Sequence, residues 1–285
     1  MHDLISDGVW PTMVTPYTAK NKIDYTGLAA LVDWYIQNNV NGLFAVCQSS
    51  EMYYLNLEER VNIAKFVKEY SKERVPVIAS GHISDNLKDQ INELEAMADT
   101  GIDALVIVSN HLAGKEEDNE IWKKRAEQIM KAVPDIPLGI YECPFPYKRV
   151  VSPDLLKWCA ETGRFNFLKD TCCDLEQIER KYQAVKGTNL KIFNANSATL
   201  LESLKIGIAG FSGVMANFHP DLYVWLVDHW MKEPEKAQTV QDFLGFSSLA
   251  ECQMYPVNAK YYLQLSGIPI QLYSRTANYE LFGRA

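Results

Sequence analysis

The sequence predicts a (β/α)8 barrel followed by a C-terminal helical extension. Eight short apolar segments recur along the chain, and their starts lie 20 to 34 residues apart, which is the length of one βα unit. Segments with helical periodicity separate them, so the strands should form a parallel sheet that is covered by helices. A doubly wound open sheet is the alternative, but no GxGxxG follows the first strand.

The eight expected strands are nearly continuous apolar runs, as is typical of a sheet that is buried on both faces. In chain order they are VWPTMVTP (9–16), NGLFAVC (41–47), VPVIAS (75–80), ALVIVSN (104–110), PLGIYECP (137–144), FNFLKDT (165–171), LKIFNAN (190–196) and GFSGVM (210–215).

Helix signals lie between these strands. An apolar stripe predicts a helix over 24–39, Asn56 is a plausible N-cap for 56–72, and Gly101 ends a helix over 84–100. Pro153 after Ser152 and Pro220 after His219 begin later helices. Beyond about residue 231 the pattern is helical only. We therefore expect a barrel over 1–230 and a helical extension over 231–285.

Composition excludes several classes of protein. The chain has 285 residues, of which 47% are hydrophobic, so it can bury a large core. A net charge of −8 without basic clusters argues against nucleic-acid binding. The sequence contains no apolar run of the length that a membrane span requires, so we expect no membrane span. The N-terminus has no signal-peptide pattern and the six cysteines form no CxxC, so we expect a cytoplasmic protein with reduced thiols.

The strongest functional signal is a lysine that ends an apolar strand. Lys169 follows Phe167 and Leu168, and in a barrel the carboxyl ends of the strands form the active face. The two-residue period of strands places Tyr141 and Lys169 at one mouth if both side chains point inward. A desolvated lysine can form a Schiff base with a carbonyl, and a nearby phenol can relay the protons of that chemistry.

Five segments, in order and at matching spacing, resemble the dihydrodipicolinate synthase / N-acetylneuraminate lyase family of Schiff-base aldolases. The resemblance covers nearly the whole chain and is more specific than any one of the matches. The segments are GVWPTMVTPY (8–17), QSSEMYYLNLEER (48–60), IYECP (140–144), FLKDTCCD (167–174) and GIAGFSGVMANFHP (207–220).

The resemblance implies roles for particular residues. Lys169 would be the Schiff-base lysine and Tyr141 the proton-relaying phenol, both catalytic. Ser49 and Ser50, with Gln48 in the first hydroxyl position of the motif, would bind the carboxylate of pyruvate or another 2-oxo acid. The second substrate would be an aldehyde. The family also implies no metal, no cofactor and a homotetramer.

Departures from the family pattern make the second substrate uncertain. Ser50 stands where the family has glycine, which predicts strain if that position needs a positive φ. The segment 108–117 and the residues after Pro144 lack the tyrosine and arginine of true dihydrodipicolinate synthases, which argues against lysine biosynthesis. Candidates for binding the variable tail of the substrate are Asn194, Asn196, Ser212 and His111.

Other interpretations stay open. Lys169 could instead be paired with Glu142 or Asp170, while Glu51 is expected to be structural and to bind loop N–H groups. His82 and His111 follow neighbouring strands, but no third ligand supports a zinc site. The expected activity is aldol cleavage or formation. A Schiff-base dehydratase or deaminase acting on a sugar acid or hydroxyproline-derived acid, or a non-catalytic 2-oxo acid sensor, is the alternative.

Overall fold

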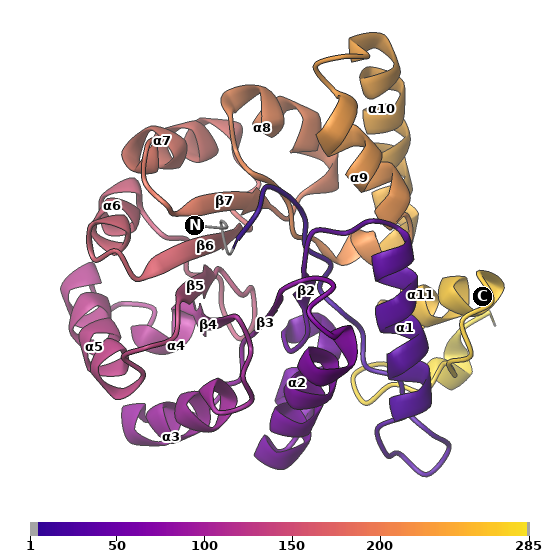
Figure 1. Ribbon diagram of the computed structural model, residues 1–285, viewed down its shortest axis with the longest axis horizontal. Coiled ribbons are helices and arrows are strands. Elements are labelled where there is room, and N and C mark those ends of the chain that lie inside the picture. Colours follow the sequence, from indigo (N-terminus) through magenta and orange to yellow (C-terminus); the bar gives the residue numbers. More distant parts are fainter. Residues whose placement is uncertain (1–4, 284–285) are drawn as a thin grey trace.

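The computed structural model describes residues 5–283 and shows the predicted (β/α)8, or TIM, barrel (Figure 1). Within these residues, eight parallel strands pair in the order β1-β8-β7-β6-β5-β4-β3-β2. They are β1 (Gly8–Val9), β2 (Leu43–Phe44), β3 (Val77–Ala79), β4 (Ala104–Val108), β5 (Leu138–Tyr141), β6 (Phe165–Asp170), β7 (Lys191–Asn194) and β8 (Gly210–Phe211).

Backbone hydrogen bonds beyond the short strands close the ring. The Asn41 N–H donates to the Val9 carbonyl at 2.9 Å, and the Phe44 N–H donates to the Pro11 carbonyl at 3.0 Å. On the other side of β1, Gly8 pairs with Gly210, where an added Cβ would lie 2.0 Å from the Gly8 carbonyl oxygen. Glycine at this pair therefore lets β1 and β8 approach each other.

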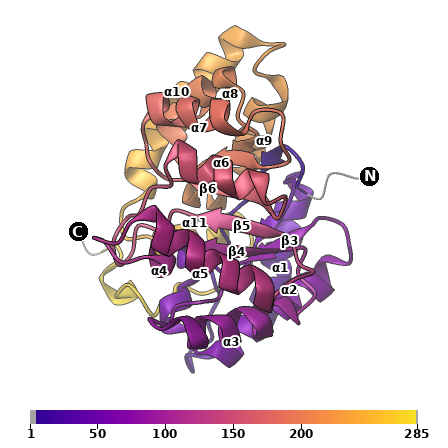
Figure 2. The same cartoon turned by 90° about the vertical axis from the view of Figure 1, so that its left-hand side faces the viewer.

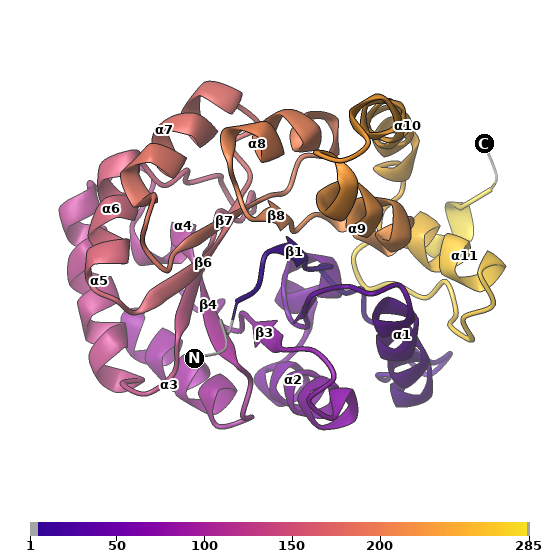
Figure 3. The same cartoon turned by 45° about the horizontal axis from the view of Figure 1, so that its top comes forward.

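Helices surround the strands, with α3, α5 and α6 forming an outer layer beside β4–β6 (Figure 2). The helices of the ring are α1 (Tyr25–Gln37), α2 (Leu57–Ser71), α3 (Leu87–Ala98), α4 (Ser109–Leu112), α5 (Asn119–Ala132), α6 (Pro153–Glu161), α7 (Leu175–Val185), α8 (Leu200–Ile206) and α9 (Pro220–His229). Outside the ring, next to α9 and α1, lie α10 (Pro234–Glu251) and α11 (Val257–Leu265) (Figure 3). No helix among residues 5–283 is long and apolar enough to cross a membrane.

Local sequence explains where several elements begin and end. The Asn56 side chain accepts from the Glu59 N–H, and the Glu59 carboxylate accepts from the Asn56 N–H, which forms the capping box of α2. The third helix begins after Asn86 instead of Ser84, because the Asn86 side chain caps it by accepting from the Asp89 N–H. The first strand is shorter than predicted because Pro11 has no N–H to donate to a ladder.

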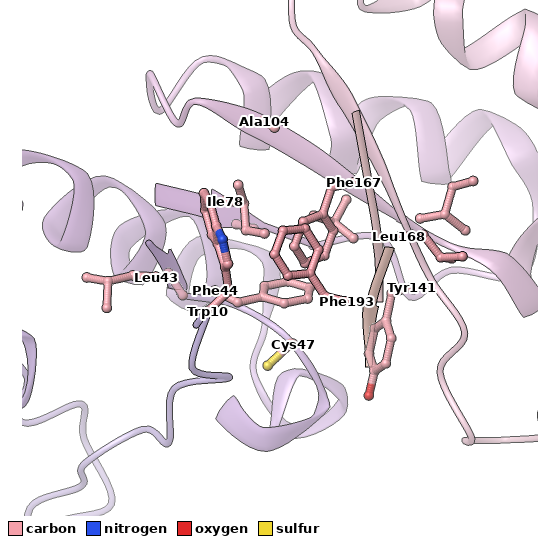
Figure 4. Close-up of a cluster of buried hydrophobic side chains, with 14 of the residues drawn as sticks. Trp10, Leu43, Phe44, Cys47, Ile78, Ala104, Tyr141, Phe167, Leu168 and Phe193 are labelled. Atoms are coloured by element: carbon pink, nitrogen blue, oxygen red, sulfur yellow. The ribbon is translucent and has the colours of Figure 1, made fainter. Parts of the chain in front are cut away.

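Aromatic side chains fill the interior of the barrel (Figure 4). The rings of Phe167 and Phe193 stack with centroids 4.7 Å apart, and Trp10 meets both rings edge-on. Phe44 packs edge-on against Phe167 and Tyr141, so Tyr141 lies at the edge of this cluster. This aromatic cluster ends near the carboxyl ends of β5 and β6, and Lys169 lies there.

Candidate active site

Lys169 and Tyr141 lie opposite each other on neighbouring strands. The register of β5 and β6 pairs Tyr141 with Lys169, and the Lys169 Nζ lies 4.7 Å from the centroid of the Tyr141 ring. Lys169 is 2% exposed and Tyr141 is 4% exposed. A Cβ added to Gly139 would lie 3.1 Å from the Cβ of Phe167. Glycine at this position therefore leaves room for the Phe167 side chain inside the barrel. The predicted shared face of the two strands is therefore confirmed.

Burial changes the acid–base chemistry of both groups. It lowers the pKa of the Lys169 ammonium to about 8, and the nearby thiols of Cys47 and Cys143 only partly oppose this effect. Burial raises the pKa of the Tyr141 phenol well above its usual value, so the phenol keeps its proton at neutral pH. Within the described part of the chain, no carboxylate lies within ion-pair distance of Lys169. Its amine is thus available as a nucleophile once it loses a proton.

The carboxylates that sequence analysis offered as partners for Lys169 belong to a different lysine, so that alternative is wrong. Lys181 on α7 is fully buried, and its Nζ contacts Glu142 Oε1 at 2.6 Å and also Asp170. The two-residue period of strands explains this arrangement. Tyr141 and Lys169 point into the barrel, so the next residues, Glu142 and Asp170, point outward toward α7.

Each carboxylate oxygen of this triad has a donor. Besides Lys181, Glu142 accepts from the backbone N–H groups of Val151 and Thr171, each at 2.8 Å, and Asp170 accepts from the Cys172 N–H at 2.9 Å. Burial and the neighbouring Asp170 raise the pKa of Glu142 to about 7. The triad therefore ties together the two strand ends that carry Tyr141 and Lys169.

The predicted carboxylate loop forms a short 3-10 turn, Gln48–Ser50. The Ser49 hydroxyl donates to Thr12 Oγ1 at 3.1 Å, and Gln48 Oε1 accepts from the Tyr141 hydroxyl at 3.4 Å. Ser50 is turned toward its own loop, with its hydroxyl 2.7 Å from both the N and the O of Cys47. Gln48 and Ser49 border a cavity above Lys169, whereas Ser50 is not among the described residues that line it.

The expected strain at Ser50 is absent, because the left-handed residue of the loop is the next one, Glu51, with φ 64°. Glu51 is buried and structural, as predicted. It accepts from Lys260 Nζ at 2.9 Å and from the backbone N–H groups of Arg275 at 2.6 Å and Thr276 at 3.0 Å. These N–H groups belong to the far C-terminal segment, so Glu51 joins the carboxylate loop to the helical extension.

A cavity of about 430 Å³ opens above Lys169. Four of the residues that line it were predicted from the sequence: Lys169, Tyr141, Gln48 and Ser49. The other lining residues were not predicted, and they are Pro144, Lys148, Thr171, Cys173, Ala195, Val214, Tyr255, Pro256 and Thr276. Lys148 lies in the loop after β5, and Thr171 and Cys173 lie in the loop after β6, so their place in barrel loops was a usable signal. Tyr255 and Thr276 had no such signal, because they come from the extension.

The four predicted tail-binding residues lie elsewhere. Asn194 donates to Thr199 and Ser203, Asn196 caps the turn at 197–199, and the Ser212 hydroxyl donates to the Trp10 carbonyl at 2.9 Å. The His111 Nε2 lies 3.2 Å from the Tyr53 hydroxyl. None of the four is among the described residues that border the cavity, because each polar side chain is directed at a neighbour within the fold.

His82, the other candidate of the histidine pair, has structural partners. Its Nε2 accepts from the Val108 N–H at 2.6 Å, and its Nδ1 lies 3.4 Å from Gln90 Oε1. Burial and the neighbouring His111 lower its pKa to about 3. Among residues 5–283 no group of three or more side chains is arranged to hold a metal ion.

A buried lysine without a carboxylate partner, next to a phenol at the carboxyl ends of barrel strands, defines a class of protein. An amine in such a place has the chemistry needed to form an imine with a carbonyl compound. Comparison with known proteins agrees with this class. The model of the dihydrodipicolinate synthetase family matches residues 5–278, so the chain belongs to that family and is an enzyme of its lyase and aldolase kind.

Curated relatives resemble the chain over most of its length. It is 29% identical over 227 residues to the putative 2-dehydro-3-deoxy-D-gluconate aldolase YagE of Escherichia coli. It is 25% identical over 222 residues to a 4-hydroxy-tetrahydrodipicolinate synthase of Methanococcus maripaludis. Each match covers 78% of this chain and 74% of the relative.

Solved structures show the same fold. The crystal structure of E. coli YagE in complex with pyruvate matches with a TM-score of 0.84 at 25% identity, and covers 95% of this chain and 92% of that one. CdNal from Clostridium difficile in complex with mannosamine matches with a TM-score of 0.85 at 23% identity, over 98% and 96% of the two chains. The latter likeness concerns the fold alone.

Proposed function

We propose that the chain is an aldolase that joins pyruvate, or another 2-oxo acid, to an aldehyde and cleaves the product through an imine on Lys169. The observation that carries this proposal is the buried Lys169 amine, with a pKa lowered to about 8 and no carboxylate within ion-pair distance among the described residues. The neutral amine attacks the ketone carbon, and loss of water gives an iminium that withdraws electrons from the neighbouring carbon.

Tyr141 is the second catalytic residue of the proposal. Its ring lies against the Lys169 amine, and its hydroxyl donates to Gln48 at 3.4 Å. From this place the phenol gives a proton to the departing hydroxyl of the carbinolamine. It then exchanges a proton with the oxygen of the aldehyde carbon as the carbon–carbon bond breaks or forms. The phenol is protonated at neutral pH, and burial raises its pKa further, which suits the first of these roles.

The carboxylate of the 2-oxo acid is assigned to Ser49 and Gln48, which border the cavity beside Lys169. Ser50 supports them indirectly, because its hydroxyl holds the backbone of Cys47. Tyr255 and Thr276 complete the wall from the C-terminal side. We therefore also propose that the extension over 231–285, of which residues up to 283 are described, is part of the active site and not an independent domain.

Borohydride trapping tests the proposal. Reduction in the presence of pyruvate should leave a pyruvyl adduct on Lys169, which peptide mass spectrometry locates. Lys169→Met should abolish the adduct, whereas Lys157→Met, which changes an exposed lysine on α6, should keep it. An intact fold with no adduct from pyruvate or from longer 2-oxo acids would refute the imine. Product analysis after turnover then separates aldol cleavage from dehydration or deamination.

We further propose that the enzyme is a cytoplasmic homotetramer. Support comes from the family resemblance and from the exposed aromatic residues Tyr54 (56% exposed) and Phe145 (50% exposed), which lie near Tyr53. The free state of all six cysteines is in keeping with a reducing compartment. Light scattering coupled to size-exclusion chromatography tests the assembly, and a monomer at micromolar concentration would refute it.

A further inference from the structure

A second phenol reaches the cavity from the C-terminal extension. Tyr255 lies between α10 and α11 and lines the cavity together with Ser49 of the carboxylate loop. Its hydroxyl lies 3.2 Å from the Asn217 Nδ2 and also hydrogen-bonds with the Ser49 side chain. Asn217 itself follows β8, in the short 3-10 turn Val214–Asn217. One hydroxyl of the extension is therefore placed between a barrel loop and the site assigned to the carboxylate of the 2-oxo acid.

The Asn217 amide fixes the direction of its hydrogen bond with Tyr255. The Asn217 Nδ2 donates to the carbonyls of Thr12 at 2.8 Å and Val214 at 2.7 Å, and the Asn217 Oδ1 accepts from the Tyr35 hydroxyl. If the amide were turned round, its oxygen would face two carbonyl oxygens, so the nitrogen is the atom beside Tyr255. An amide nitrogen donates and does not accept. The Tyr255 oxygen therefore accepts from Asn217, and its own proton is directed elsewhere.

The proton of Tyr255 is available to an anionic ligand. Burial raises the pKa of the Tyr255 phenol, so the hydroxyl stays protonated and adds no negative charge to the cavity wall. Its acceptor within the protein is the Ser49 oxygen, since the Ser49 proton goes to Thr12 Oγ1 at 3.1 Å. A hydrogen bond to a carboxylate is about twice as strong as one to a neutral hydroxyl. A carboxylate beside Ser49 would therefore take the Tyr255 proton in place of the serine.

The carboxylate loop by itself offers few side-chain donors. The Ser50 hydroxyl is engaged with the backbone of Cys47, and the Gln48 Oε1 is an acceptor that faces the Tyr141 hydroxyl at 3.4 Å. The donors that remain are the Ser49 hydroxyl and the amide nitrogen of Gln48. A carboxylate has two oxygens with about four lone-pair sites, so a third donor from outside the loop improves its solvation inside the cavity.

We infer that Tyr255 binds the carboxylate of the 2-oxo acid as a hydrogen-bond donor that the Asn217 amide orients. The inference rests on the proposed function and deepens it, since it adds a donor from the helical extension to the carboxylate site. Because Asn217 belongs to the barrel and Tyr255 to the extension, this donor is correctly oriented only while the extension is packed against the barrel. Recognition of the carboxylate therefore depends on that packing.

Trapping on Lys169 with two matched ketones tests this inference. Pyruvate carries the carboxylate, and methyl pyruvate has the same 2-oxo group without the charge. Tyr255→Phe removes the hydroxyl and keeps the ring. We expect the concentration of pyruvate that gives half-maximal trapping to rise about tenfold or more, the effect of one lost hydrogen bond to a charged group. The corresponding concentration of methyl pyruvate should change by less than about threefold, because a neutral ester is a weaker acceptor.

The variant should fold, because the two hydrogens of the Asn217 Nδ2 keep the carbonyls of Thr12 and Val214 as acceptors. Tyr261→Phe is the matched control, since it removes a phenol hydroxyl from a residue of α11 that is 43% exposed, and it should leave both concentrations unchanged. An unchanged pyruvate concentration in Tyr255→Phe, or an equal rise for the two ketones, overturns the inference alone. Absence of the pyruvyl adduct in the wild type overturns the proposed function and the inference with it.

Discussion

Replacement of Lys181 by methionine removes the cation of the Glu142–Lys181–Asp170 triad and keeps a side chain of similar length. Lys181 and Glu142 have side chains that are 0% exposed, so water cannot take the place of the lost ammonium. Loss of one partner of a buried ion pair destabilises a protein by about 3–5 kcal/mol. Because this ammonium donates to two carboxylates, we expect a loss of about 4–5 kcal/mol near pH 8.

The loss should depend on pH, and its sign follows from the pKa of Glu142. That pKa is raised to about 7 in the folded protein, above the ordinary value of 4.5. Between these values the folded state binds the proton more tightly than the unfolded state, so this group's contribution to stability falls as pH rises. Without Lys181 the pKa of Glu142 rises further. At about pH 5 its carboxyl is protonated and can donate to Asp170, so the loss should shrink to about 2–3 kcal/mol.

Equilibrium unfolding in urea at the two pH values measures both losses. Lys157→Met, at an exposed position on α6, is the matched control and should change the free energy of unfolding by less than about 0.5 kcal/mol. The double variant Lys181→Met with Glu142→Gln should recover part of the loss near pH 8, since a neutral amide can donate to Asp170. A loss below about 1 kcal/mol near pH 8, or an equal loss at both pH values, would refute this reasoning.

Three other predictions test the site. The rate of pyruvate trapping on Lys169 should rise with pH through a midpoint near 8, because the neutral amine is the nucleophile, and a midpoint above about 10 in a pH series would contradict the effect of burial. Tyr141→Phe should slow both formation of the adduct on Lys169 and carbon–carbon bond formation, the latter by about 100-fold or more, so an unchanged steady-state rate would exclude the phenol from proton transfer. Glu51→Gln should weaken the ion pair with the buried Lys260 and speed hydrogen exchange over 273–276, and unchanged exchange would show that Glu51 does not hold this segment.

Much of the fold and the centre of the site were predictable from local sequence. Apolar runs at regular spacing indicated eight βα units, and the two-residue period of strands placed Tyr141 and Lys169 on one face. Both signals are short in range, since they depend on how a strand or a helix alternates its side chains. Strand ends were less predictable. The apolar run at 104–110 gives a strand only to Val108, because the short helix α4 begins at Ser109.

The sequence by itself determined the barrel, the lysine at a strand end and the phenol beside it. Tertiary structure alone decided which charges meet. Lys181, not Lys169, takes the two carboxylates, because its side chain extends from α7 to Glu142 and Asp170 on the outer side of the strands. Glu51 meets Lys260 across 209 residues of chain, and it also accepts from the N–H of Thr276, which lines the cavity. No periodicity spans such a distance, because these pairings depend on how completed elements pack and on the need of every buried charge for a partner.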